Sequence, residues 1–153
     1  MRNDLEVNFY HFTSVPLLKA VPSLLKKMYD TKKNILVLCK NEEELEEFDK
    51  YLWSFSTKTF LPHGTAKDLQ PEEQPIFLST KIVKDNSPKI LLSFIDLSEE
   101  DIKKFGSVIF VFFGNKNEEF VASMYKKHDQ MKNNKKMQVK FWSQDVSTGK
   151  WFQ

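Results

Sequence analysis

The chain opens with alternating apolar and polar residues, a pattern that is typical of a β-strand. Leu5, Val7 and Phe9 are separated by Glu6 and Asn8, and this period of two places one side of a strand against a core. Four later segments are short and almost wholly apolar, which is typical of strands buried on both faces of a parallel sheet. They span residues 34–40, 75–78, 89–94 and 108–113, and a last strand is predicted at 139–142.

Between these strands, apolar residues recur three and four positions apart, the spacing that predicts helices. In residues 17–28 this face is clear, but Pro22 interrupts it, so the regular helix either begins near Pro22 or is kinked there. Asn41 and Ser98 are predicted helix caps, because acidic residues stand three positions after each of them. A further helix is predicted at about 117–133.

Alternating strands and helices predict an α/β fold, namely a single three-layer domain over residues 1–153 with a mostly parallel central sheet and helices on both faces. The only four glycines are at 64, 106, 114 and 149, and they form neither GxGxxG nor GxxxxGK[ST]. The shape expected is therefore like that of a mononucleotide-binding domain without a phosphate loop, and we expect no cofactor.

Other chemistry is poorly supplied. Cys39 is the sole cysteine, the three histidines are scattered, and no serine has a GxSxG setting. Carboxylates near Asp96 and Glu118 are explained by solvated helix starts, so we expect no active site. No apolar run approaches the roughly 20 residues needed to span a bilayer. We expect a soluble, cytoplasmic protein with no membrane contact.

Charge is uneven along a chain whose net charge is only +2. Residues 125–140 contain six lysines and one aspartate, a local balance of +5. A lysine-rich segment is commonly just a solvated face, but apolar neighbours such as Tyr125, Met131 and Trp142 favour a docking site. Such a site could take a short acidic peptide with a hydrophobic end, or single-stranded nucleic acid.

Three large aromatic residues, Trp53, Phe55 and Phe60, lie close together in the sequence. They are either core residues or an exposed patch that a partner covers, since a lone monomer avoids such a patch. His63 follows closely and could act as a base or ligand, although a structural role in a turn is the simpler interpretation.

The order of these motifs resembles the chi subunit of bacterial DNA polymerase III, over essentially the whole chain. The most specific segments are D-x-x-L-W at 49–53 and F-x-P-H at 60–63. Weaker matches are 7–10, 34–39, 74–76 and 141–144, with G-K-W at 149–151.

The resemblance implies a non-enzymatic accessory subunit of the clamp-loader complex that links two partners. One is the psi subunit, whose binding residues in this family correspond to Trp53 and Phe60, so that chi is a monomer alone and a heterodimer with psi. The other is the acidic C-terminal tail of single-stranded DNA-binding protein (SSB), which ends in Pro-Phe; DNA is then contacted mainly indirectly. The tail site implied by the resemblance comprises Tyr125, Lys126, Lys127, His128 and Lys132.

Two other functions compete with this one. Direct binding of single-stranded nucleic acid would use the basic stretch from Lys126 to Lys140, near Trp142. An enzyme or nucleotide binder on the α/β scaffold is disfavoured by the missing glycine loop.

Overall fold

The computed structural model describes residues 5–55, 61–68, 70–145 and 147–153. The described strands are β1 (Leu5–Phe12), β2 (Ile35–Leu38), β3 (Gly64–Thr65), β4 (Ile76–Ser79), β5 (Ile90–Ser93), β6 (Ser107–Phe113), β7 (Met137–Gln144) and β8 (Trp151–Phe152). The helices are α1 (Leu17–Tyr29), α2 (Glu42–Phe55), α3 (Glu99–Ile102) and α4 (Glu119–Met131), with a 3-10 turn at Pro71–Glu73.

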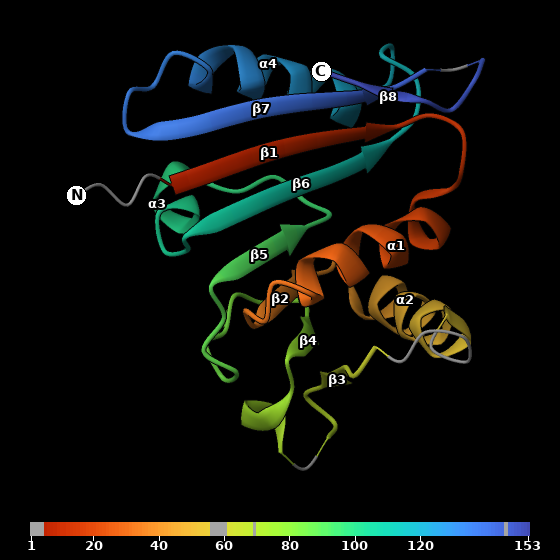
Figure 1. The fold of residues 1–153 in the computed structure, drawn as a ribbon, viewed down its shortest axis with the longest axis vertical. Coiled ribbons are helices and arrows are strands. Elements are labelled where there is room, and N and C mark those ends of the chain that lie inside the picture. The colour runs from red at the N-terminus through yellow and green to blue at the C-terminus, as the bar shows by residue number, and fades with distance from the viewer. Residues whose placement is uncertain (1–4, 56–60, 69, 146) are drawn as a thin grey trace.

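All eight strands form one sheet in the order β3-β4-β2-β5-β6-β1-β7-β8. Neighbouring strands are parallel except β7 and β8, which pair antiparallel through Ser143 with Phe152 and Gln144 with Trp151. The predicted α/β architecture with a mostly parallel sheet is confirmed (Figure 1).

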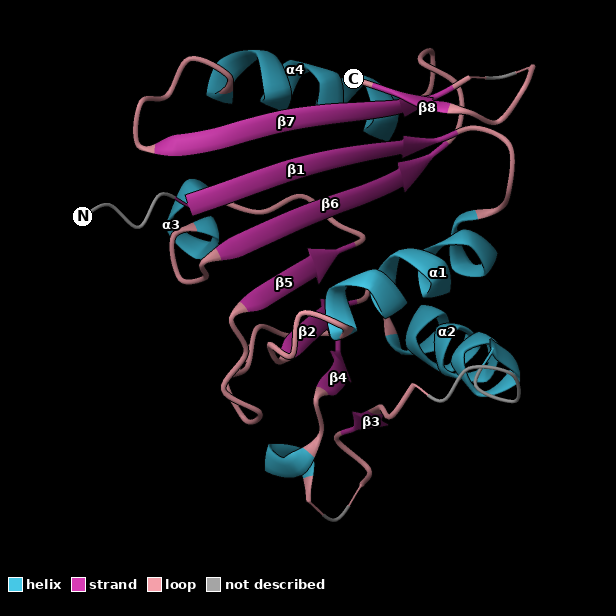
Figure 2. Cartoon of the chain, in the orientation of Figure 1, coloured by secondary structure: helices cyan, strands magenta, loops and turns pink. Residues whose placement is uncertain are grey.

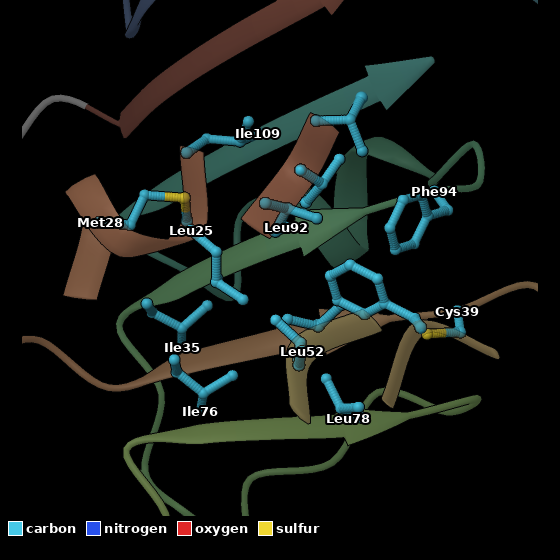
Figure 3. Close-up of a cluster of buried hydrophobic side chains, with 14 of the residues drawn as sticks. Leu25, Met28, Ile35, Cys39, Leu52, Ile76, Leu78, Leu92, Phe94 and Ile109 are labelled. Carbon is cyan, nitrogen blue, oxygen red and sulfur yellow. The ribbon is translucent and has the colours of Figure 1, made fainter. Parts of the chain in front are cut away.

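Helices cover both faces of the sheet (Figure 2). On one face, α1 and α2 pack over β2, β4, β5 and β6. Leu25, Met28 and Leu52 of these helices meet Ile35, Ile76 and Leu92 of the sheet in a dry cluster (Figure 3). On the other face, Ile102 of α3 and Val121 and Met124 of α4 pack against β1, β5 and β6.

The two predicted caps are confirmed. At the start of α2, the Glu44 N–H donates to Oδ1 of Asn41 at 2.8 Å, and Oε1 of Glu44 accepts from the Lys40 N–H at 2.7 Å. The two side chains thus provide hydrogen-bond acceptors for two backbone N–H groups. Ser98 caps α3 by accepting from the Asp101 N–H at 3.1 Å.

Four elements differ from the sequence predictions in their bounds or were not predicted. α1 begins at Leu17, well before Pro22, which lies buried in its second turn. The last long strand, β7, extends beyond the predicted 139–142 on both sides. β3 and β8 have only two residues each, too few to give an alternating pattern. None of the helices in the described segments is long and apolar enough to cross a membrane.

Candidate functional site

Trp53 lies in the last turn of α2 and is 59% exposed, the largest exposure among the large hydrophobic side chains described. The neighbouring stripe of α2, formed by Leu45, Phe48 and Leu52, is buried. Phe55 packs partly against the core. Of the two interpretations of these aromatics, the exposed one therefore holds for Trp53, whereas Phe55 has a packing role.

The indole of Trp53 packs against the ring of His63. Its ring centroid is 4.7 Å from that of His63, whose side chain is almost fully buried. Nδ1 of His63 donates to the Leu61 carbonyl oxygen at 2.8 Å, and Nε2 lies 3.1 Å from Oδ1 of Asp49. This second contact has an ion-pair distance without hydrogen-bond alignment. These two contacts fix the His63 ring, and the Trp53 indole packs against it. Phe60 lies outside the described residues.

We define the Trp53 surface as Trp53, the His63 ring that it contacts, and Asp49, which lies beside His63. A single exposed indole on a rigid support is the kind of residue that dominates protein interfaces. It presents a flat apolar area with little entropy to lose on binding.

A second candidate site is a groove of about 940 Å³ at the carboxyl ends of β1, β6 and β7. β1 leads to α1 on one face of the sheet and β6 leads to α4 on the other, so this is the point where the chain direction across the sheet reverses. Ligands of doubly wound sheets bind at such points. We call this site the Tyr125 groove; its lining includes His11, Lys116, Tyr125, His128, Phe141 and Phe152.

His11 and Tyr125 form one wall of the Tyr125 groove. Nε2 of His11 lies 2.6 Å from the Gly114 carbonyl oxygen, which can only accept, so Nε2 carries a proton and donates it. When His11 is neutral, Nδ1 accepts a hydrogen bond from the Tyr125 hydroxyl, which lies 2.7 Å away. Burial lowers the pKa of His11, and the nearby Lys116 charge lowers it further, against the raising effects of the Gly114 hydrogen bond and Glu118. A neutral His11 therefore fixes the Tyr125 ring.

Gly114 shapes the turn that leads from β6 into α4. Its φ is +133°, a backbone conformation that glycine adopts readily and other residues rarely adopt. A β-carbon at this position would also lie 2.5 Å from Oε2 of Glu118. That carboxylate oxygen accepts from the Asn115 N–H at 2.7 Å and so holds the turn. The chain consequently needs glycine at the mouth of the groove.

Aromatic rings line the rest of the Tyr125 groove. The Phe141 ring lies 4.6 Å from that of Tyr125 and 4.9 Å from that of His128 between centroids. Burial lowers the pKa of His128, with opposing smaller effects of Asp129 and Lys132. Lys116 places its Nζ 5.1 Å from the centroid of the Tyr125 ring. The groove thus combines an apolar aromatic wall with a cation at its rim.

The lysines of the basic stretch do not share one surface. Lys126 is exposed on α4, whereas Nζ of Lys127 donates to the Leu97 carbonyl oxygen at 2.7 Å and pairs with Asp96 at 2.9 Å. Lys132 pairs with Asp129 at 3.4 Å. Lys140 lies on β7 with Trp142, on the face opposite Phe141. The predicted tail residues therefore divide: Tyr125 and His128 line the groove, and the lysines point in different directions around α4.

Most residues of the groove escaped the sequence analysis, among them His11, Lys116 and Phe152. His11 could have been found, because the period of β1 places it on the same face as Val7 and Phe9. Lys116 lies in a loop and Phe152 in a two-residue strand, and their approach to Tyr125 depends on tertiary contacts that no local pattern encodes.

Among the described residues, no group of three or more His, Cys, Asp or Glu side chains could hold a metal ion. Cys39 is buried, and burial raises the pKa of its thiol far above the ordinary range, so the thiolate form is suppressed. The two surfaces offer aromatic and charged contacts rather than a nucleophile or a metal ligand set.

An α/β domain with an exposed indole on one face and an aromatic groove at its switch point has the features of a protein-binding module. Residues 5–136 match the family described as DNA polymerase III chi subunit, HolC, and the chain therefore belongs to this family of accessory replication subunits. The probable DNA polymerase III subunit chi of Rickettsia prowazekii (strain Madrid E) is 31% identical over 99 residues, which are 65% of this chain. The matched region spans 58% of that relative's length.

Proposed function

We propose that this chain is a non-catalytic subunit that links the clamp loader, through psi, to the acidic C-terminal tail of SSB during DNA replication. The observation that carries the proposal is the presence of two unlike adhesive sites on opposite faces of one sheet, the Trp53 surface beside α2 and the Tyr125 groove beside α4. A linking protein needs two separate sites of this kind. It acts in the cytoplasm, as one domain, and contacts DNA mainly through SSB.

For psi, the proposed binding residues are Trp53 and Phe60. The support comes from Trp53, whose 59% exposure leaves a large apolar area open to water. Covering such an area by a partner is favourable in proportion to the apolar surface removed from water. The chain is then a monomer alone and a heterodimer with psi.

For the SSB tail, the proposed residues are Tyr125, Lys126, Lys127, His128 and Lys132. The aromatic wall of the Tyr125 groove suits the terminal Phe of the tail, while Lys126 at the exposed side of α4 attracts the acidic residues that precede it. Lys116 adds a cation at the rim. Lys127 would have to leave Asp96 to join this site, so its role is the smallest of the five.

Calorimetric titration of the chain with a peptide copying the SSB tail tests the proposal. We expect binding that weakens with added salt and is lost when the terminal Phe is deleted, because the charges attract the peptide and the groove holds the ring. A peptide of the same composition in scrambled order is the control. Equal binding of the tail, the truncated tail and the scrambled peptide would overturn the proposal.

A further inference from the structure

None of the described helices covers one part of the sheet. On the face that carries α1 and α2, strands β1 and β7 lie uncovered toward the viewer in Figure 1. A second groove, of about 310 Å³, runs between this bare strip and α1. We call it the Trp142 groove; it is lined by Tyr10, Phe12, Trp142 and Trp151 on the sheet side and by Ala20, Ser23, Leu24 and Lys27 on α1.

Three partly exposed aromatic rings meet in the Trp142 groove. Tyr10 and Trp142 are opposite each other on paired strands, and their rings are nearly parallel, with centroids 6.2 Å apart. Trp151 of β8 stands edge-on to Tyr10, with centroids 5.6 Å apart, and is 38% exposed. Nε1 of Trp142 is enclosed and has no hydrogen-bond partner among the described residues, so packing alone fixes this ring.

The charged side chain that lines the Trp142 groove is a lysine. The groove lining contains Lys27 and no carboxylate. Lys19 precedes Ser23 and Lys27 by four and eight positions on α1, which places the three on one side of the helix. Lys140 shares a face of β7 with Trp142. Within the described residues, none of these three lysines has a carboxylate partner, so their charges are available to an anionic ligand.

From these contacts we propose that the Trp142 groove binds single-stranded nucleic acid, with bases stacked on Trp142, Tyr10 and Trp151 and phosphates beside Lys27 and Lys140. Aromatic platforms flanked by cations bind single strands without sequence preference, because every base presents a π-face. A bound amphipathic helix would need an aliphatic surface, and this groove offers only Leu24 and Ala20 as aliphatic side chains. The ligand is thus distinct from the peptide proposed for the Tyr125 groove.

The placement differs from that expected for the basic stretch as a whole. Lys126 lies on α4 and Lys132 is its C-cap residue, on the other face of the sheet, whereas Lys140 of that stretch shares the face of Trp142. Binding should therefore depend on α1 and the chain end rather than on α4. This separates the proposal from nonspecific attraction by lysines.

Fluorescence anisotropy with a labelled oligodeoxythymidylate of about 16 nucleotides tests this inference. We expect binding by the full chain at low salt and about tenfold weaker binding for Trp151→Ala, which removes one stacking ring. Lys27→Glu should weaken binding by a similar factor and flatten the salt dependence, since each neutralised phosphate on a single strand contributes a slope of about −0.7. Lys27 is exposed, so this variant remains informative if Trp151→Ala does not fold.

Two matched controls decide the outcome. Trp53→Ala removes an exposed indole elsewhere, and Lys126→Glu reverses a charge on the other face; both should leave oligonucleotide affinity within about twofold. No binding by the parent chain at low salt would overturn the proposal, as would an equal loss in Lys126→Glu and Lys27→Glu. Self-association that Trp151→Ala abolishes, without oligonucleotide binding, would instead assign the groove to a second copy of the chain.

Discussion

The Trp53 surface and the Tyr125 groove expose aromatic residues in opposite ways. Trp53 is a single projecting ring on a helix end, supported by His63 and open to solvent on most of its area. In the groove, Tyr125, His128 and Phe141 form a concave wall in which each ring contacts another. The first shape suits a partner that supplies its own pocket, and the second suits a partner that supplies a projecting side chain.

Their electrostatics differ as well. The Trp53 surface contains the carboxylate of Asp49 beside His63, whereas the ammonium group of Lys116 lies over the ring of Tyr125, and Lys126 follows Tyr125 on α4. Binding at the Trp53 surface should therefore depend on apolar area, and binding at the groove on both an apolar end and negative charge. Under the proposed function, we therefore expect the two partners to bind without competition.

The largest effect is expected for Trp53→Ala. Psi affinity should fall about thirtyfold or more, corresponding to about 2 kcal/mol, because an exposed Trp at an interface centre carries much of the binding energy. Stability should change little, since the indole is mostly in water. Calorimetric titration with psi measures the first effect and urea unfolding the second.

Phe120→Ala is the matched control for that variant, since Phe120 is another exposed aromatic but lies on α4. It should leave psi affinity unchanged. Equal losses in Trp53→Ala and Phe120→Ala would show that psi does not distinguish the two faces.

The next effect concerns Tyr125. Tyr125→Ala should weaken the SSB-tail peptide about tenfold by removing part of the aromatic wall. Tyr125→Phe keeps the ring, so peptide affinity should be largely retained. The lost hydroxyl leaves Nδ1 of His11 without its donor and should lower the free energy of unfolding by about 1 kcal/mol. Peptide titration and urea unfolding of both variants distinguish the contribution of the ring from that of the hydroxyl. A tenfold loss of peptide affinity in Tyr125→Phe would contradict the claim that the aromatic ring binds the peptide.

Salt should sharpen the comparison further. Raising ionic strength screens the attraction between exposed lysines and an acidic peptide, so tail affinity should fall several-fold between about 50 and 500 mM salt. Psi affinity at the Trp53 surface should change much less. Parallel titrations at the two salt concentrations measure this, and an equal response of both partners would contradict the assignment.

The smallest effect is a pH dependence of stability near the groove. Burial lowers the pKa of both His11 and His128 in the folded chain, whereas unfolded histidine titrates near 6.5. The unfolded state therefore binds more protons below that pH. Stability should be full above about pH 6.5 and should fall as the pH drops from there toward the lowered folded pKa values. Urea unfolding at pH 7.5 and 5.5, with His128→Gln as comparison, should show a smaller loss in the variant; an equal loss would exclude His128.

Local patterns predicted the central part of the fold well. β2 is short and wholly apolar, β5 is apolar except for Ser93, and a helix cap follows each of them, so sequence and structure agree closely there. The start of α1 was ambiguous in the sequence because Pro22 has no backbone N–H to donate within a helix. In the structure its ring lies on the buried face of α1. The two-residue strands β3 and β8 were missed because pairing with a neighbour, rather than local sequence, defines them.

The candidate sites were partly predictable. The exposure of Trp53 could be named as one of two alternatives, but only tertiary structure separates it from Phe55 two residues later. Tyr125 and His128 were indicated by the family resemblance, whereas their link to His11 spans more than a hundred residues. Lysines were the least predictable, because Lys127 turns toward Asp96 and Lys140 lies on the other face.

The central claim is that two partners bind at once through separate surfaces. It is tested most directly by titrating the SSB-tail peptide into the chain alone and into the chain saturated with psi. The account predicts the same peptide affinity, within about twofold, in both titrations, because the Trp53 surface and the Tyr125 groove lie on opposite faces of the sheet. Displacement of the peptide by psi would contradict it.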